Sequence, residues 1–166
     1  MHTGQHVKAA PTPPEHQQAA QQRLEALLCL DLYVASRAII GLYRPLLAPH
    51  RLTYPQYLVL LALWQHGPSS VKGLGARLTL DAGTLSPLLK RLEAAGYLAR
   101  ERQTHDAREL QVALTPKGSA LQTVLADVPG QIACATGLDA SETRALQTAL
   151  RDLTARIAGS SGETGE

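Results

Sequence analysis

The sequence predicts a mainly α-helical fold with one small β-hairpin, and three observations support this prediction. The 166 residues are 45% apolar but only 4% aromatic, with no phenylalanine, so leucine, alanine, valine and isoleucine must form the core. Leucine and alanine favour helices. Apolar residues recur at spacings of three and four along much of the chain. After Gly96 the pattern changes to alternation of apolar and polar residues, as in a half-buried strand.

The first helix is expected over about residues 17–47. Leucines stand three or four residues apart at its start, at Leu24, Leu27, Leu28 and Leu32. Residues 1–16 precede it with several prolines, glycines and glutamines and no apolar period. Nothing offsets the entropy cost of ordering such a segment, so we expect a disordered arm.

Three more helices are expected in the middle of the chain. Thr53 is a good N-cap, and Pro55 a good first-turn residue, for a helix that stops at Gly67. A short helix follows and runs to about Leu78. Asp81 can cap the next helix, which ends where the alternating pattern begins.

Two alternating runs, residues 97–100 and 110–114, flank a polar turn at residues 103–107 and predict a β-hairpin. The order short helix, turn, helix, hairpin is that of a winged helix-turn-helix domain. The helix after Asp81 fits the part of a recognition helix, because leucines fall on one face at the helical period. These are Leu85, Leu88, Leu89 and Leu92.

The opposite face of that helix has the composition of a DNA-binding surface. It carries small hydroxyl residues, one proline and two cations, namely Thr84, Ser86, Pro87, Lys90 and Arg91. Small side chains let a helix approach base edges, and lysine or arginine can bind phosphate or guanine. The wing adds Arg100, Arg102 and Arg108, which suit a minor groove or its phosphates. A merely solvated face is the alternative, and the adjacent hairpin favours DNA binding.

Two helices are expected after the hairpin. Thr115 repeats the capping signal for a helix from Pro116 to about Cys134, and a last helix runs from Ser141 to Ile157. Residues 159–166 are polar, and we expect a flexible tail. The apolar faces of the first and last helices lie outside the DNA-reading module and need a partner to cover them.

Composition narrows the class of protein further. The net charge of +2 is uneven: residues 72–117 carry eight basic and five acidic side chains, or +3, which leaves −1 for the rest. No apolar run approaches the ~18 to 20 residues that span a bilayer, and no apolar signal segment begins the chain, so we expect a cytoplasmic protein without a membrane partner. With no Cys-x-x-Cys motif, we expect no metal and no cofactor.

The two cysteines are not expected to form a structural disulfide, because a cytoplasmic compartment keeps thiols reduced. Cys29 is either a buried apolar filler or a redox group. Tyr33 stands one helical turn after it, and Tyr43 and Tyr54 add two hydroxyls. A thiol attacks peroxide as the thiolate, which phenolic O–H donors would stabilise. Core packing is the alternative role for the tyrosines.

The stretch from Leu78 to Gly118, LTLDAGTLSPLLKRLEAAGYLARERQTHDARELQVALTPKG, resembles the MarR family of regulators. Its signature is Asp106-x-Arg108 followed by Val112-x-Leu114-Thr115-x-x-Gly118, and the resemblance extends over roughly residues 24–157. It implies a single domain over residues 17–158 with a DNA-reading module at about 54–115 and dimerisation helices at about 17–47 and 116–157.

The resemblance also implies partners and roles. Members of the family are homodimers, which places two recognition helices about one DNA turn apart on double-stranded DNA with an inverted-repeat operator. An aspartate and an arginine of the wing pair in such proteins, so Asp106 is implied to hold the wing geometry rather than to contact DNA.

Three further stretches resemble the organic hydroperoxide resistance regulators (OhrR), a branch of this family. They are residues 28–37, with Leu-Cys-Leu-Asp-Leu-Tyr, residues 43–47, with Tyr-Arg-Pro-Leu-Leu, and residues 52–59, with Leu-Thr-Tyr-Pro-Gln-Tyr-Leu-Val. The resemblance implies that Cys29 senses organic hydroperoxides beside Tyr33, Tyr43 and Tyr54. It also implies that Cys134 of the other subunit is the resolving cysteine, as in two-cysteine members.

The expected function is therefore that of a repressor released from DNA when Cys29 is oxidised, and not that of an enzyme. Two alternatives stay open at this point. A MarR-type regulator can be released by reversible binding of a small apolar or phenolic ligand. A thiol peroxidase also needs an activated cysteine and a resolving thiol, but the winged helix argues against it.

Overall fold

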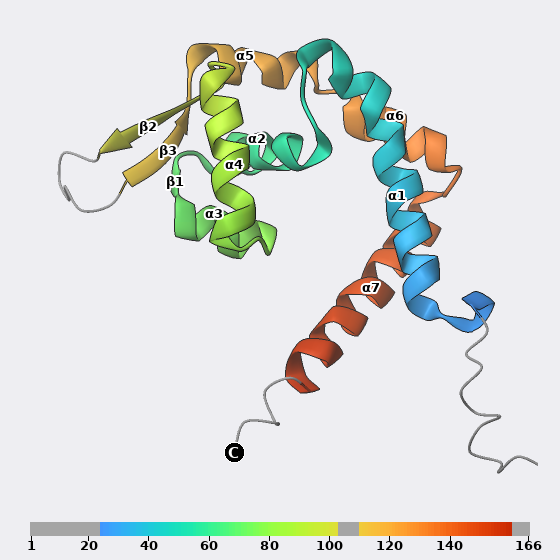
Figure 1. Ribbon diagram of the computed structural model, residues 1–166. Coiled ribbons are helices and arrows are strands. Elements are labelled where there is room, and N and C mark those ends of the chain that lie inside the picture. The colour runs from blue at the N-terminus through green and yellow to red at the C-terminus, as the bar shows by residue number, and fades with distance from the viewer. Residues whose placement is uncertain (1–23, 103–109, 161–166) are drawn as a thin grey trace, which may run out of the picture. The chain divides into compact units, whose positions relative to one another are not determined.

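The computed structural model describes residues 24–102 and 110–160 (Figure 1). The predicted arm, residues 17–23 of the first predicted helix, the polar turn of the hairpin and residues 161–166 of the predicted tail lie outside the described residues. Residues 159 and 160 of the predicted tail are helical instead. The chain forms two compact units, one up to Ala38 and one from Ile39 onward. No helix within the described ranges is long and apolar enough to cross a bilayer.

The first unit contains a 3₁₀ turn, η2 (Leu24–Ala26), and the first half of α1 (Leu28–Leu47). The sequence predicted one helix through this region, and that prediction is wrong at Leu27, where the α-helix begins only after the turn. The Leu27 N–H donates to the carbonyl of Leu24 three residues back, as in a 3₁₀ turn. Leucines three apart fit both kinds of helix, so their spacing could not distinguish them.

The second unit holds the rest of α1 and a compact helical module after it. Its first elements are η3 (Ala48–His50), α2 (Tyr54–His66), α3 (Val71–Leu78) and α4 (Ala82–Ala94). The predicted starts of α2 and α4 are confirmed. Gln56 accepts from the Thr53 N–H at 2.9 Å, Ser70 accepts from the Gly73 N–H at 3.1 Å, and Asp81 accepts from the Thr84 N–H at 2.8 Å.

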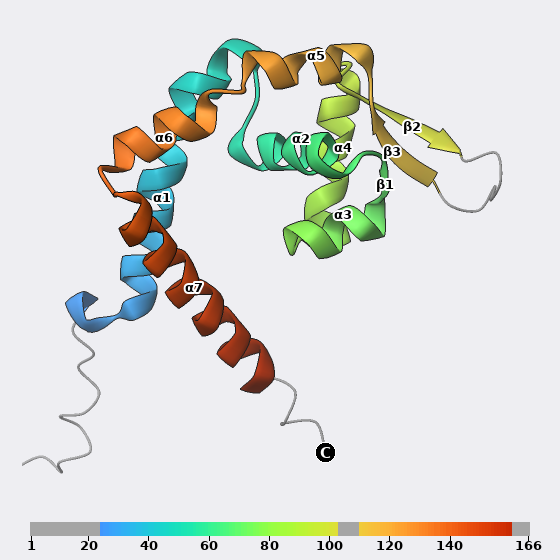
Figure 2. The same cartoon turned by 180° about the vertical axis from the view of Figure 1, so that it is seen from behind.

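The predicted hairpin is present as β2 (Leu98–Arg102) and β3 (Leu110–Leu114), paired antiparallel with Leu98 opposite Leu114. The structure adds a third strand, β1 (Ser69–Ser70), on the other side of β3. The sequence did not predict it, because two residues are too few to show an alternating pattern. In both views the hairpin projects away from α2, α3 and α4 (Figures 1 and 2).

The core lies among α2, α3, α4 and the sheet. Its largest fully buried side chains are leucine and valine: Leu47, Val59, Leu60, Leu63, Leu74, Leu85, Leu89, Leu92 and Val112. Burying each such side chain contributes roughly 1.5–3 kcal/mol. Packing in this core therefore holds α4 and the hairpin in a fixed position within the second unit.

The single helix predicted from Pro116 to Cys134 is wrong, because the structure divides it into α5 (Pro116–Val124) and α6 (Val128–Thr136). Pro129 explains the break: proline has no N–H, and its ring clashes with the carbonyl four residues back, at Leu125. The last helix, α7 (Ala140–Ser160), begins one residue earlier than predicted and ends three residues later than Ile157.

Candidate functional site

The start of α4 is fixed by its cap. One carboxylate oxygen of Asp81 accepts from the Thr84 N–H, and the other accepts from the Thr84 hydroxyl, each at 2.8 Å. These hydrogen bonds lower the pKa of Asp81 because they favour the ionised carboxylate. A negative charge at this end also complements the helix dipole. The cap thus fixes the residue at which α4 begins.

The leucine stripe of α4 points inward, as predicted, with Leu85, Leu89 and Leu92 fully buried and Leu88 partly buried. The opposite side is open to solvent. We call it the reading face; it consists of the exposed residues Thr84, Ser86, Pro87, Lys90 and Arg91. The structure therefore brings all five predicted α4 residues onto one surface that a DNA groove could receive.

Arg100 at the base of the wing has a partner that sequence analysis missed. Its Nε lies 3.2 Å from a carboxylate oxygen of Glu93 in the last turn of α4. Arg100 is partly buried, and this ion pair joins β2 to α4. Arg102 ends β2, but its side chain, like Asp106 and Arg108, lies outside the described residues.

On α1, Cys29 is exposed and its thiol is free. Tyr33 stands one turn later and is also exposed, with its hydroxyl accepting from Arg37 Nη1 at 3.4 Å. The Arg37 guanidinium also lies 5.5 Å from the centre of the Tyr33 ring. The Arg37 cation therefore lies beside Tyr33, eight residues after Cys29 on the same helix.

The second unit brings Tyr43 and Tyr54 together, with ring centres 4.6 Å apart. Tyr57 completes the cluster, with its ring centre 5.9 Å from that of Tyr43. Burial raises the pKa of all three phenols, and the pKa of Tyr43 is raised further by the two neighbours. At neutral pH they remain protonated and can donate hydrogen bonds. Tyr57 was not singled out in the sequence, although it stands three residues after Tyr54 on the same helix.

Cys134 lies on α6 and is exposed, with a free thiol. Its backbone carbonyl accepts from the Gly137 N–H, which closes the helix. Among the described residues, no group of histidines, cysteines and carboxylates could hold a metal ion. The two thiols belong to different units, Cys29 to the first and Cys134 to the second.

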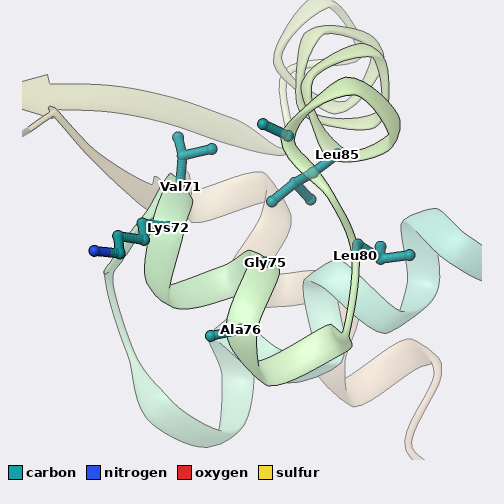
Figure 3. A pocket seen from close by; sticks show the side chains of 7 residues that line it. Val71, Lys72, Gly75, Ala76, Leu80 and Leu85 are labelled. Carbon is teal, nitrogen blue, oxygen red and sulfur yellow. The ribbon is translucent and has the colours of Figure 1, made fainter. Parts of the chain in front are cut away.

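A pocket of about 450 Å³ opens between α3 and α4 (Figure 3). Its lining is mostly apolar: Val71, Gly75, Ala76, Leu80, Ala82 and Leu85, with Lys72 at the edge. In the close-up, the Lys72 ammonium points away from the leucines (Figure 3). The pocket therefore offers apolar surface rather than a charged anchor.

Comparison with known proteins identifies the family. The MarR family model matches residues 52–110, which contain α2 to α4 and β2. The regulator TtmR of Methylorubrum extorquens is 45% identical over 143 residues, covering 86% of this chain and 73% of that protein. The organic hydroperoxide resistance transcriptional regulator of Bacillus subtilis is 41% identical over 131 residues, covering 79% of this chain and 89% of that protein.

Solved structures agree with these relatives. Reduced AbfR bound to DNA superposes with a TM-score of 0.68 at 35% identity, covering 85% of this chain and 99% of that one. AbfR comes from Staphylococcus epidermidis and is also known in a disulfide form, with a TM-score of 0.54. These relatives are transcriptional regulators and not enzymes, which goes against the peroxidase alternative. The chain belongs to the MarR family of DNA-binding transcriptional regulators.

Proposed function

We propose that this regulator is a homodimeric repressor that leaves its operator when an organic hydroperoxide oxidises Cys29. The observation that carries the proposal is the exposed, free thiol of Cys29 one helical turn before the exposed Tyr33 on α1. Tyr43 and Tyr54, a protonated pair in the second unit, are the further phenolic donors that the proposal requires. The name of the Bacillus subtilis relative supports the same effector class.

The chemistry begins with the Cys29 thiolate. It attacks the distal oxygen of the hydroperoxide, an S–O bond forms, the O–O bond breaks, and the alkoxide takes a proton to leave as an alcohol. In this proposal Tyr33, Tyr43 and Tyr54 stabilise the thiolate as O–H donors. The thiol of Cys134 from the other subunit then attacks the sulfenic sulfur, and water leaves as the disulfide forms.

Exposed apolar side chains on helices outside the DNA-reading module support the dimer. On α1 they include Leu28, Val34, Ile39 and Ile40, and on α7 they are Leu146, Leu150 and Ile157. None of the described side chains of α7 is buried. A second copy of the chain would cover these faces and present two reading faces to an inverted repeat.

The DNA contacts proposed here come from the reading face and the wing. Lys90 and Arg91 would contact base edges or phosphates from the major groove. Arg102 and Arg108 would reach the minor groove or its phosphates, with Arg100 at the wing base and Asp106 holding the wing geometry.

A gel shift with the DNA upstream of the protein's own gene, with and without an organic hydroperoxide, tests the proposal. Wild type should bind when reduced and dissociate on oxidation. Cys29→Ser should bind and stay bound, because serine forms no thiolate. Release of Cys29→Ser by the peroxide would disprove the sensor assignment and leave the DNA-binding assignment intact.

A second candidate is favoured by the apolar pocket between α3 and α4. There, a small apolar or phenolic ligand would wedge against the base of the recognition helix and lower DNA affinity without oxidation. This mode predicts that non-oxidising phenols release both wild type and Cys29→Ser, and that Ala76→Leu, which fills the pocket, blocks the release.

A further inference from the structure

The turn that links α4 to β2, residues 95–97, is held by Thr115, the N-cap of α5, and by Lys117 in the first turn of α5. Three successive carbonyls of this turn accept hydrogen bonds from these two residues. The Ala95 carbonyl accepts from Lys117 Nζ at 2.7 Å, the Gly96 carbonyl from the Thr115 hydroxyl at 2.6 Å, and the Tyr97 carbonyl from the Thr115 N–H at 3.1 Å. The end of the recognition helix is therefore fastened to α5 rather than left free.

Lys117 makes a second contact within this junction. Its ammonium lies 4.6 Å from the centre of the Tyr97 ring, within the range of a cation–π interaction. The ammonium also stands at the C-terminal end of α4, where the helix dipole favours a positive charge. Lys117 thus contacts both the Ala95 carbonyl, directly after the recognition helix, and the Tyr97 ring, directly before strand β2.

The junction is anchored on two further sides. The Tyr97 hydroxyl donates to the His50 carbonyl at 3.2 Å, and Trp64 Nε1 donates to the Gly118 carbonyl at 3.0 Å. A Cβ added at Gly118 would collide with the carbonyl oxygen of Tyr97. The start of α5 thus presses directly on the turn, and a shift of one requires a shift of the other.

We propose that Lys117 is a positioning residue for DNA binding. It fixes the reading face and the wing in one arrangement by holding the Ala95 carbonyl and the Tyr97 ring, and it makes no phosphate contact of its own. This role goes beyond the sensor chemistry and depends only on DNA binding. It concerns the reduced protein and is independent of Cys29.

Two other roles for Lys117 make different predictions. A lysine that binds phosphate contributes to the salt dependence of DNA affinity, because its contact releases counterions. A lysine that only stabilises the fold changes the melting temperature and leaves operator affinity unchanged. A positioning lysine lowers affinity without changing the salt slope.

The experiment uses the full-length reduced protein and a DNA duplex that wild type selects from a random pool. Lys117→Met keeps an unbranched apolar side chain, one atom shorter than lysine, but removes the charge and the donor. We expect about five- to tenfold weaker binding with an unchanged slope of log affinity against log salt. We also expect faster hydrogen exchange at the amides of residues 95–98 without DNA. Lys117→Arg should restore the operator affinity and the slow hydrogen exchange, since a guanidinium keeps the charge, the donor and the cation–π contact.

Lys90→Met on the reading face is the matched control, because it removes a lysine proposed to contact DNA directly. It should weaken binding and reduce the salt slope by about one. A similar slope change in Lys117→Met would overturn the proposal in favour of a phosphate contact. Unchanged affinity in Lys117→Met, with or without a lower melting temperature, would overturn it as well. If Lys117→Met does not fold, Lys117→Gln, which keeps a donor without the charge, provides the same comparison.

Discussion

Arg100 of strand β2 and Glu93 of helix α4 form an ion pair, with 3.2 Å between the arginine Nε and a carboxylate oxygen. The pair joins the base of the wing to the last turn of the recognition helix. It also places an acidic side chain next to a cation that could otherwise bind DNA phosphate. In the proposed complex, Glu93 would therefore reduce the electrostatic attraction of this region for DNA.

Replacement of Glu93 by glutamine should raise DNA affinity and steepen its salt dependence, because Arg100 is released and an acidic group is removed. Both side chains are partly exposed, so the loss in unfolding free energy should be under about 1 kcal/mol. Titrations at several salt concentrations and thermal unfolding measure the two effects. Asp152→Asn, an exposed carboxylate on α7, is the control and should change neither. A weaker complex with Glu93→Gln would show that the ion pair is needed to place the wing.

Replacement of Arg91 or Lys90 by alanine should weaken operator binding. If either side chain contacts a guanine, the loss is ~1 to 3 kcal/mol and one base position becomes less selective. Both residues are exposed on α4, so the fold should be retained. Binding to a library of single-base operator variants measures the loss of selectivity. If neither variant changes affinity, α4 does not enter the groove.

Asp81 should make stability depend on pH in the acid range. Hydrogen bonds from Thr84 lower the pKa of this carboxyl in the folded protein, whereas in the unfolded chain it is near about 4. The cap contribution is therefore fully present above about pH 4 and is lost as the pH falls through the lower, folded pKa. Asp81→Asn keeps a cap acceptor that does not titrate. The difference in melting temperature between wild type and Asp81→Asn should shrink or reverse between pH 5 and pH 2.

Gly118→Ala should destabilise the fold, because its Cβ would collide with the backbone oxygen of Tyr97. The collision is between two backbone segments, which cannot rotate out of the way as a side chain can. We therefore expect the free energy of unfolding to fall by about 1–3 kcal/mol or more. Gly41→Ala in α1 is the control. A Cβ there meets no atom within 4 Å, and alanine in a helix should be neutral or stabilising. Denaturant unfolding measures the stability of both variants. If Gly118→Ala is as stable as Gly41→Ala, the turn of residues 95–97 can move away from the start of α5.

The two cysteines should give separate phenotypes under organic hydroperoxide. Wild type should run at twice its mass on a non-reducing gel, because the proposed disulfide joins subunits. Cys134→Ser should stop at sulfenic acid on Cys29 without a covalent dimer. A monomer-sized oxidised wild type with an internal disulfide would contradict the proposed pairing.

Loss of a tyrosine hydroxyl should slow the oxidation of Cys29 without abolishing it. Tyr43→Phe or Tyr54→Phe each removes one donor, and a hydrogen bond to a charged group contributes ~1.5 to 3 kcal/mol. Stopped-flow measurement of thiol loss gives the rate. Tyr97→Phe, at the α4–β2 junction, is the control and should leave the rate unchanged. Unchanged rates in both Tyr43→Phe and Tyr54→Phe would exclude these phenols from the thiol site.

The sequence predicted those helix starts that depend on local hydrogen bonds. Thr53, Asp81 and Thr115 each act within three residues of themselves, so their signals are visible in the sequence. The inward leucines of α4 were predictable for the same reason, because the helical period is a local property.

Features that depend on distant partners could not be predicted in this way. The pairing of Ser69 with Val112 joins segments 43 residues apart, and the contact of Lys117 with Ala95 joins segments 22 residues apart. The division between α5 and α6 could have been predicted, because Pro129 marks it in the sequence. It was missed because apolar residues continue at helical spacing across the break.

Trp64, the only tryptophan of the chain, donates its indole N–H to the Gly118 carbonyl, and its ring centre lies 6.1 Å from that of Tyr57. The chain thus carries a built-in fluorophore at the contact between α2 and the start of α5. Breaking that hydrogen bond would expose the indole to water and shift its emission to longer wavelength. Stopped-flow fluorescence of the unlabelled protein could therefore follow, in real time, whether this contact opens when DNA is released.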